Sequence, residues 1–472
     1  LKMDHLNKKG RIFLVGIGGI GMSGIAEILH NLGYEVTGSD QKVGSNVVRL
    51  KKLGIKIKIG HNASNIKGSS LIVYSSAIKK QNVEIKEAIK IKIPLISRAE
   101  MLAELMRMKK TITVAGSHGK TTTISIISEI FVKSELDPTV INGGIINSLG
   151  SNTRLGLGDW MIVETDESDG SFIKLPSFSG LITSIDDEHI DFYNNMRNLE
   201  NAFEQYINNI SVFGFSVICS DDDKLYKIAT QQKRSDHFFY GTNARANYKA
   251  KNIRINKQGQ TFDIEIKNIN EKRKIYKNIQ FPMHGRHNLL NALGAITISH
   301  RTGISFKFIR QALRGFEGVK RRMTLIKTLD QKKYFDDYAH HPTEIEASLK
   351  ALRDLSNRRI ITVVQPHRFS RIEQTFDKFS KSFKNSDFVI VLPVYAAGEN
   401  KIKNINANSL AISIQKNSKT KTLAFNNFKK VEDFLNDEVK KGETVIFMGA
   451  GNISELANNY LNDMGKEHVS IS

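Results

Sequence analysis

Hydrophobic residues near the start of the chain alternate between short apolar runs and longer stretches with helical spacing. The run Arg11–Val15 predicts a buried strand, and the apolar positions from Met22 to Asn31 predict a helix that ends at Gly33. Strands that alternate with helices form parallel sheets, so this segment predicts a βαβ domain. Its later elements are expected as strands at Tyr34–Thr37 and Leu71–Tyr74 and a helix around Glu100–Met106.

A second series of strands and helices begins at Thr111. Its expected elements are a helix at Thr122–Lys133 and strands at Thr111–Ala115, Trp160–Val163 and Leu181–Ser184. Between Asn252 and Gln280, apolar and polar residues alternate on both sides of Lys257-Gln258-Gly259. That pattern predicts a hairpin, and hence an antiparallel patch attached to a parallel sheet.

A third series begins near Arg322 and again predicts a doubly wound α/β sheet. Its strands are expected at Lys333–Asp336, Ile360–Val364, Phe388–Leu392 and Thr444–Met448. We therefore expect an α/β protein of three domains: a Rossmann-like domain at residues 1–109, a central P-loop-type domain with a mixed sheet at 110–321, and a Rossmann-like domain at 322–472.

Composition narrows the class of protein. A chain of 472 residues fits two to four domains, and 40% hydrophobic with 25% charged residues is typical of soluble globular proteins. No apolar stretch approaches the roughly 18 residues of a membrane-spanning helix, and the first ten residues lack the apolar core of a signal peptide. The single cysteine, Cys219, excludes an intrachain disulfide and a cysteine-based zinc site. We expect a cytoplasmic protein that does not insert into membranes.

The formal net charge of +21 permits three kinds of partner: nucleic acid, a membrane surface or small anionic substrates. The lysines are scattered through the chain, and neither an aromatic-plus-basic RNA motif nor zinc-finger spacing is present. We therefore expect a protein that binds phosphate groups and has no nucleic-acid partner.

Glycines cluster directly after the first predicted strand, in the sequence Gly16-Ile17-Gly18-Gly19-Ile20-Gly21. The pattern G-x-G-x-x-G between a strand and a helix lets the backbone approach a pyrophosphate at the helix N-terminus. Asp40 follows about 20 residues later, where a carboxylate can bond a ribose hydroxyl. The alternative is a tight turn whose glycines serve packing. The ligand need not be NAD, because any nucleoside diphosphate joined to a sugar has the same pyrophosphate.

A second loop of this kind follows the strand predicted at Thr111–Ala115. It reads Gly116-Ser117-His118-Gly119-Lys120-Thr121-Thr122-Thr123 and opens a helix. In such a loop, backbone N–H groups hold phosphate oxygens, the lysine reaches the β and γ oxygens, and a threonine hydroxyl ligates Mg²⁺. Its spacing is shorter than that of the general P-loop, so it is a variant of that motif. A chance Gly-Lys-Thr at a strand–helix junction is the alternative.

Acidic residues and histidines follow the next two strands of the second series. Residues 164–169 read Glu-Thr-Asp-Glu-Ser-Asp, and residues 186–189 read Asp-Asp-Glu-His. Ligands of open α/β sheets bind at the carboxyl ends of strands, so both groups are expected near Lys120. Glu164 and His189 are candidates for holding magnesium, although a polar loop at a strand end explains the same residues.

Cationic and imidazole side chains are expected at the carboxyl edge of the third sheet. His340 and His341 follow the strand predicted to end at Asp336, and Arg368 and Arg371 follow the strand Ile360–Val364. The two arginines share a face if their segment is helical. Arginine pairs suit bidentate contacts with carboxylates or phosphates, whereas a solvated basic loop is the alternative.

Together these motifs resemble the Mur ligase family, in order and over essentially the whole chain. The stretches that carry the resemblance are Gly16–Gly24, Ser75-Ser76-Ala77-Ile78, residues 97–102, Gly116–Thr123, Gly285-Arg286-His287-Asn288 to Asn291, and Gly318-Val319-Lys320-Arg321-Arg322. Ser117 stands where the family usually has threonine. The segment 203–208 contains no lysine, so the carbamylated lysine of several relatives is not expected.

The resemblance implies an ATP-dependent ligase that joins L-alanine to the carboxylate of UDP-N-acetylmuramate through an acyl phosphate, in peptidoglycan precursor synthesis. It implies ATP and two magnesium ions, and a monomer or homodimer. The UDP-sugar would contact Gly16, Gly18, Gly19, Gly21, Asp40, Ser75, Ser76 and Arg98. ATP would contact the loop from Gly116 to Thr122 together with Asn288, Asn291, Arg322 and Asp337. Magnesium would bind Thr121, Glu164 and His189, and the catalytic residues would be Lys120, His189, His340, His341, Arg368 and Arg371.

Three other functions remain open on the sequence. The nearest is the ligase of the same family that adds a whole tripeptide to the same UDP-sugar, against which the Gln365–Arg371 stretch argues. An NAD-linked oxidoreductase explains Gly16–Asp40 but gives Lys120 no task. A P-loop switch or nucleic-acid motor explains Lys120 and the charge but not the first domain.

Overall fold

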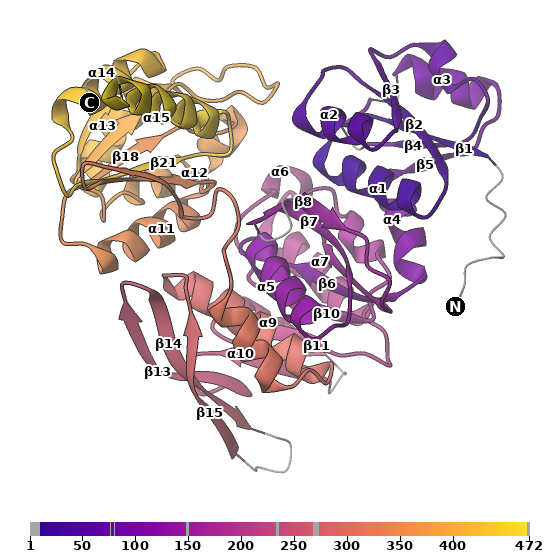
Figure 1. Ribbon diagram of the computed structural model, residues 1–472, viewed down its shortest axis with the longest axis horizontal. Helices are drawn as coiled ribbons and strands as arrows, with labels where there is room; N and C mark the ends of the chain where they lie inside the picture. Colours follow the sequence, from indigo (N-terminus) through magenta and orange to yellow (C-terminus); the bar gives the residue numbers. More distant parts are fainter. Residues whose placement is uncertain are drawn as a thin grey trace. The chain divides into compact units, whose positions relative to one another are not determined.

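The computed structural model describes residues 10–75, 77–79, 81–147, 151–232, 236–267 and 273–469. It contains three separate sheets of five, ten and six strands (Figure 1). The chain forms two compact units. The larger unit comprises Leu1–Ile253, Thr261–Phe281 and Leu290–Glu317, and the smaller comprises Arg254–Gln260, Pro282–Leu289 and Gly318–Ser472. The predicted α/β class, with its three sheets, is confirmed.

The first sheet is entirely parallel and has the order β3-β2-β1-β4-β5. Its strands are β1 (Arg11–Val15), β2 (Glu35–Asp40), β3 (Lys56–Ile59), β4 (Ser69–Tyr74) and β5 (Leu95–Ser97). Its helices are α1 (Ile20–Asn31), α2 (Ser45–Lys52), α3 (Val83–Lys90) and α4 (Arg98–Arg107). Crossover connections put α1 and α2 on one side of this sheet and α3 on the other, and α4, which follows the last strand, packs on the side of α1 and α2 (Figure 1).

Strand β2 extends beyond the apolar run Tyr34–Thr37 and ends at Asp40, the acidic residue expected about 20 residues after the glycine loop. Gly38 and Ser39 are buried although neither is apolar, because β2 lies between β1 and β3. A Cβ at Gly38 would lie 2.5 Å from the Leu14 carbonyl oxygen, so a larger residue does not fit at this crossing. The extension matters because it carries Ser39 and Asp40 to the glycine loop.

The ten-stranded sheet has the order β15-β14-β13-β12-β11-β10-β6-β9-β7-β8. Its parallel core comprises β6 (Lys110–Ala115), β9 (Trp160–Glu164), β10 (Ser179–Ile182), β11 (Ser216–Cys219) and β12 (His237–Gly241). The outer strands are β7 (Thr139–Ile146), β8 (Ser151–Arg154), β13 (Tyr248–Asn256), β14 (Gly259–Lys267) and β15 (Arg273–Phe281). The short turn between β13 and β14 makes them a hairpin, as predicted.

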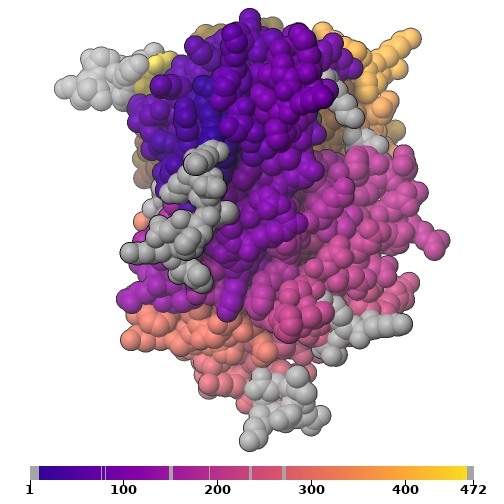
Figure 2. Space-filling view, turned by 90° about the vertical axis from the view of Figure 1, so that its right-hand side faces the viewer, coloured from indigo at the N-terminus to yellow at the C-terminus, as the bar shows by residue number. Residues whose placement is uncertain are grey.

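Helices cover this central sheet. They are α5 (Lys120–Lys133), α6 (Ile190–Tyr193), α7 (Met196–Asn208), α8 (Asp223–Thr230), α9 (Arg286–Arg301) and α10 (Phe306–Arg314). Strand β10 begins and ends two residues before the predicted Leu181–Ser184. Thr183 and Ser184 therefore lie in the loop beyond the strand, where both contact the second glycine loop. In the space-filling view, the described residues of the first sheet and its helices are indigo to violet, and much of the central sheet is magenta (Figure 2).

The six-stranded sheet of the smaller unit has the order β16-β17-β21-β18-β19-β20. Its strands are β16 (Thr324–Leu329), β17 (Lys332–Asp337), β18 (Ile360–Val364), β19 (Phe388–Val391), β20 (Lys421–Ala424) and β21 (Thr444–Met448). Helices α11 (Pro342–Leu355), α12 (Phe369–Lys381) and α13 (Ala407–Ser418) pack on one face. Helices α14 (Phe428–Glu438) and α15 (Ile453–Val469) pack on the other.

Strand β16 was not predicted, and it pairs antiparallel with β17 at the edge of an otherwise parallel sheet. Its residues are only partly buried, so it lacks the apolar run that marks the central strands.

Among the residues that the structure describes, no helix combines the length and apolar character needed to cross a membrane.

Candidate active site

The first glycine loop connects β1 to α1 and is bonded to the end of β2. The N–H groups of Gly16 and Ile17 donate to the Ser39 carbonyl at 2.9 and 3.0 Å, and the Gly18 N–H donates to Asp40 Oδ2 at 2.8 Å. Gly16 has a φ of 78°, a conformation that favours glycine. The sequence predicted Asp40 near this loop, and the structure places it there. Its role toward a ribose stays a prediction.

Two further predicted residues lie against this loop. A Cβ at Gly21 would lie 2.7 Å from Arg98 Nη1, and one at Gly16 would lie 3.3 Å from Ser75 Cβ. Arg98 also lies 3.8 Å from Asp166 Oδ2, which follows β9 in the central sheet. Ser76, the remaining predicted residue of this group, lies outside the described residues.

The second glycine loop leads from β6 into α5, as predicted. Gly119 has a φ of 82° immediately before the helix, and a Cβ there would collide with Asn291 Oδ1. The structure therefore brings Asn291, on α9, against the loop. The start of α5 presents backbone N–H groups and the positive end of the helix dipole, which suit a phosphate.

Lys120 begins α5 and folds back over the loop. Its Nζ donates to the Gly116 carbonyl at 2.5 Å and to the two Glu167 carboxylate oxygens at 2.6 and 2.9 Å. Burial alone would lower the pKa of Lys120, but the Glu167 and Glu164 charges outweigh it and hold the pKa above its usual value. Burial raises the pKa of Glu167 to about 7. Lys120 therefore remains an ammonium beside the loop, and its predicted contact with phosphate oxygens stays a prediction.

Thr121 and Glu164 form one candidate magnesium site. The Thr121 hydroxyl donates to Glu164 Oε2 at 2.9 Å, and the Gly143 N–H donates to the same oxygen at 2.8 Å. Hydroxyl and carboxylate oxygens are the ligands that Mg²⁺ prefers. His189 lies instead with Glu167 and Glu188, in a group whose ligand atoms are all within 4.8 Å of one another. The predicted set of three is thus divided between two neighbouring groups.

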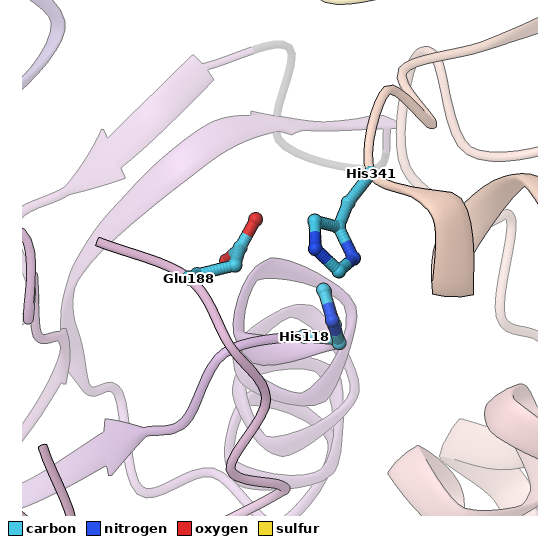
Figure 3. Close-up of side chains that lie close together, drawn as sticks. All are labelled: His118, Glu188 and His341. Atoms are coloured by element: carbon cyan, nitrogen blue, oxygen red, sulfur yellow. The ribbon is translucent and has the colours of Figure 1, made fainter. Parts of the chain in front are cut away.

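His118 lies beside the acidic residues that follow β10. Its Nε2 lies 2.9 Å from Asp186 Oδ2, and the Asp186 N–H donates to the Ser117 hydroxyl at 2.8 Å. Figure 3 shows His118 and Glu188 close together; it also labels His341, which belongs to the smaller unit. Bonds from both Ser117 and His118 thus fix the position of the acidic loop against the phosphate loop.

In the smaller unit, Asp337 ends β17 and is buried. It accepts hydrogen bonds from the Ala339 N–H at 2.8 Å, the Ser348 hydroxyl at 2.9 Å and the Met323 N–H at 3.1 Å. Burial raises its pKa to about 6 despite these donors.

The other predicted residues near the end of β17 surround Glu344. Arg322 lies 3.6 Å from Glu344 Oε1, and the His340 N–H donates to Glu344 Oε2 at 3.2 Å. His341 is buried at the start of α11. Asn288 belongs to a different element, α9, and its Nδ2 donates to the His284 carbonyl. The predicted roles of these residues in binding stay predictions.

Arg368 and Arg371 have different surroundings. Arg368 precedes α12 with a φ of 65°, and its Nε donates to Glu399 Oε1 at 2.6 Å. Arg371 lies within α12 and contacts His367 Nδ1 at 3.4 Å, and among the described residues it has no carboxylate partner. The expectation of a shared helix face therefore fails, because Arg368 lies outside the helix. The predicted role of Arg371 toward a carboxylate stays a prediction.

Sequence reasoning did not single out Glu167 or Glu399, the partners of Lys120 and Arg368. Glu167 belongs to the predicted acidic stretch 164–169, but the sequence does not distinguish it from its neighbours. Glu399 lies 31 residues beyond Arg368, and only the fold brings the two together. His367 belongs to the predicted basic stretch after β18, but sequence reasoning assigned it no role of its own; its ring centroid lies 5.5 Å from that of Tyr395, on which it stacks, and 5.8 Å from that of His340.

Models of known protein families match the sequence over most of its length. Residues 11–110 match the Mur ligase family catalytic domain, residues 114–299 the Mur ligase middle domain, and residues 321–451 the Mur ligase glutamate ligase domain. The chain belongs to the Mur ligase family. Of the relatives that it matches, UDP-N-acetylmuramate–L-alanine ligase of Brucella anthropi is 43% identical over 448 residues, covering 95% of this chain and 96% of the relative. The enzyme of that name from Rhodospirillum rubrum is 44% identical over 450 residues, covering 95% and 94%.

Solved structures of Mur ligases have the same fold. The crystal structure of UDP-N-acetylmuramate-alanine ligase from Thermotoga maritima is similar with a TM-score of 0.81 at 27% identity, covering 97% of this chain and all of that chain. A murein peptide ligase from Psychrobacter arcticus is similar in fold, with a TM-score of 0.71 at 21% identity, covering 97% and 99%. The resemblance inferred from the motifs is thereby confirmed.

Proposed function

We propose that the chain is an ATP-dependent ligase that joins L-alanine to the carboxylate of UDP-N-acetylmuramate, releasing ADP and phosphate. The observation that carries the proposal is the loop of Lys120, with the Thr121–Glu164 pair beside it, in a chain 43% identical to ligases named for this reaction. A Mur ligase of this kind supplies a precursor of peptidoglycan.

In the first step, an oxygen of the muramate carboxylate attacks the γ-phosphorus of ATP, and the bond from that phosphorus to the β–γ bridging oxygen breaks, which gives an acyl phosphate and ADP. Lys120 offsets the charge that develops on the transferring phosphoryl group, and the N–H groups at the start of α5 hold the β and γ oxygens. Thr121 and Glu164 would hold magnesium, which neutralises phosphate charge when bound. We propose two metal ions, and Glu167, Glu188 and His189 form the second candidate group of ligands.

In the second step, the alanine amine attacks the acyl carbonyl, the C–O bond to the phosphate breaks, inorganic phosphate leaves, and the proton lost by the amine passes to solvent. Arg371 is proposed to hold the alanine carboxylate, because a guanidinium without a carboxylate partner can make a bidentate contact. His367 and His340 lie beside it, and burial lowers the pKa of His367 to about 4, so its ring is neutral near pH 7. A neutral imidazole does not compete with Arg371 for the carboxylate.

Phosphate release separates this function from its nearest competitor. With ATP, magnesium and UDP-N-acetylmuramate, we expect L-alanine to support rapid phosphate release and the tripeptide L-alanyl-γ-D-glutamyl-meso-diaminopimelate to support little. A preference for the tripeptide would assign the chain to the other ligase of the family. Phosphate release without any UDP-sugar would contradict both.

A further inference from the structure

A buried polar cluster lies behind the first glycine loop, on the other side of β2. Its centre is Glu84 in the first turn of α3, whose side chain is fully buried. Glu84 Oε2 accepts from the Ser39 hydroxyl and from His61 Nδ1, both at 2.7 Å, and Oε1 accepts from Asn65 Nδ2 at 2.7 Å. Glu84 therefore joins β2, α3 and the loop after β3.

This cluster is not a catalytic triad. A hydrolytic triad needs the serine and the carboxylate on different nitrogens of the imidazole, whereas Ser39 Oγ and Glu84 Oε2 both contact Nδ1 of His61. Ser39 is also fully buried, so no substrate can reach its hydroxyl. The cluster thus acts through what it holds in place.

What it holds is the dipeptide on which the glycine loop rests. The Ser39 carbonyl accepts the N–H groups of Gly16 and Ile17, and Asp40 accepts the N–H of Gly18, while the Ser39 side chain is bonded to Glu84. The backbone carbonyl of Asp40 also accepts a hydrogen bond from the Gly60 N–H at 2.8 Å, and Gly60 directly precedes His61 in the chain. Every backbone contact of the loop with β2 therefore passes through residues that the cluster fixes.

One atom of the cluster has no partner. His61 Nδ1 donates to Glu84, while Nε2 on the other side of the ring is buried without a hydrogen bond to any described residue. Most buried polar atoms in folded proteins have a hydrogen-bond partner, so this nitrogen is an exception within the cluster. Tyr334 Oη is another such atom, so Nε2 does not by itself mark a binding region, and what distinguishes the cluster is the set of bonds that it makes.

We propose that Glu84 is a positioning residue for the UDP-sugar: through Ser39 and His61 it fixes the glycine loop in the shape that receives the pyrophosphate. The inference rests on the proposed function, because it assumes that this loop binds UDP-N-acetylmuramate. A pre-formed loop binds more tightly, since no free energy is spent on ordering it.

The test compares the dissociation constants of UDP-N-acetylmuramate and Mg-ADP by calorimetry, for the wild type, Glu84→Gln, Ser39→Ala and the double variant. We expect each single change to weaken UDP-N-acetylmuramate binding about tenfold, or 1.4 kcal/mol. The double variant should be little weaker than Glu84→Gln, because both changes break one connection. Mg-ADP, which binds at the Lys120 loop, should keep its affinity.

Ile85→Val is the matched control, because Ile85 is the buried neighbour of Glu84 on α3 and makes none of these hydrogen bonds. It should lower the melting temperature and leave both affinities unchanged. Unchanged UDP-sugar binding in Glu84→Gln and Ser39→Ala, or an equal loss for Mg-ADP, would overturn the positioning role. A wild-type protein that does not bind UDP-N-acetylmuramate would overturn the proposed function itself.

Discussion

Lys120→Met gives the sharpest test of the phosphate loop. The change keeps the length of the side chain and removes the ammonium that Glu167 and the Gly116 carbonyl hold in place. Loss of one group that stabilises transition-state charge costs about 10²–10³ in kcat, or roughly 3–4 kcal/mol. We expect phosphate release at saturating substrates to fall by at least that factor.

Stability changes for a separate reason. Without Lys120, Glu167 is buried with no cation, but it can take up a proton. Protonating a carboxyl whose usual pKa is 4.5 costs about 3 kcal/mol at pH 7, at 1.36 kcal/mol for each unit, which caps the loss of folding free energy through this group. Burial already raises the pKa of Glu167 to about 7 in the wild type, which therefore bears the same cost between pH 4.5 and 7, so the melting temperature of Lys120→Met should fall further below the wild-type value as pH rises above about 7.

The double variant Lys120→Met/Glu167→Gln separates the two effects. It removes both charges of the buried pair, so we expect it to regain most of the lost stability and none of the turnover. Melting curves at pH 6 and 8, together with phosphate release, measure both. Turnover within about threefold of the wild type in either variant would refute the role of Lys120 in phosphoryl transfer.

The remaining predictions concern the amino acid, the metal and pH. Arg371→Lys should raise the KM for alanine at least tenfold and leave the KM for the UDP-sugar unchanged, because lysine offers a point charge in place of the fork. An unchanged KM for alanine in Arg371→Lys would exclude Arg371 from the site. Arg368→Lys should instead lower the melting temperature, because the Arg368 guanidinium is bonded to Glu399. Glu164→Gln should raise the magnesium concentration needed for half-maximal activity, and an unaltered magnesium dependence would exclude Glu164 as a ligand. Burial holds the pKa of His367 near 4 instead of 6.5, so the unfolded chain takes up a proton at a higher pH than the folded chain, and the free energy of unfolding falls as pH drops from about 6.5 to 4. His367→Asn should remove that part of the pH dependence, as measured by urea unfolding. An unchanged pH dependence in this variant would contradict the prediction.

The elements with local signals were predictable from the sequence. Each glycine loop follows a strand and opens a helix, and the segment of alternating apolar and polar residues before Gln280 forms a hairpin. Strand β16 was missed because an edge strand is half-exposed and lacks an apolar run. Gly38 and Ser39 lie beyond the apolar run that predicts β2, and their burial comes from the neighbouring strands, which the sequence does not reveal.

The pairing of charges was the part that sequence reasoning could not reach. The acidic stretch after β9 offers several carboxylates, and only the path of the backbone decides that Glu164 faces Thr121 while Glu167 faces Lys120. Similarly, spacing suggested that Arg368 and Arg371 act together. The positive φ of Arg368 places it before the helix, where Glu399 binds it.

The most direct test of the proposed reaction uses UDP-N-acetylmuramate labelled with ¹⁸O in its carboxylate. The labelled substrate is incubated with the protein, ATP, magnesium and L-alanine, and both products are examined by mass spectrometry. If the carboxylate attacks the γ-phosphorus, one labelled oxygen passes to the released phosphate, and the UDP-sugar gains one alanine residue in amide linkage. Unlabelled phosphate, or labelled phosphate without the alanyl product, would contradict the account.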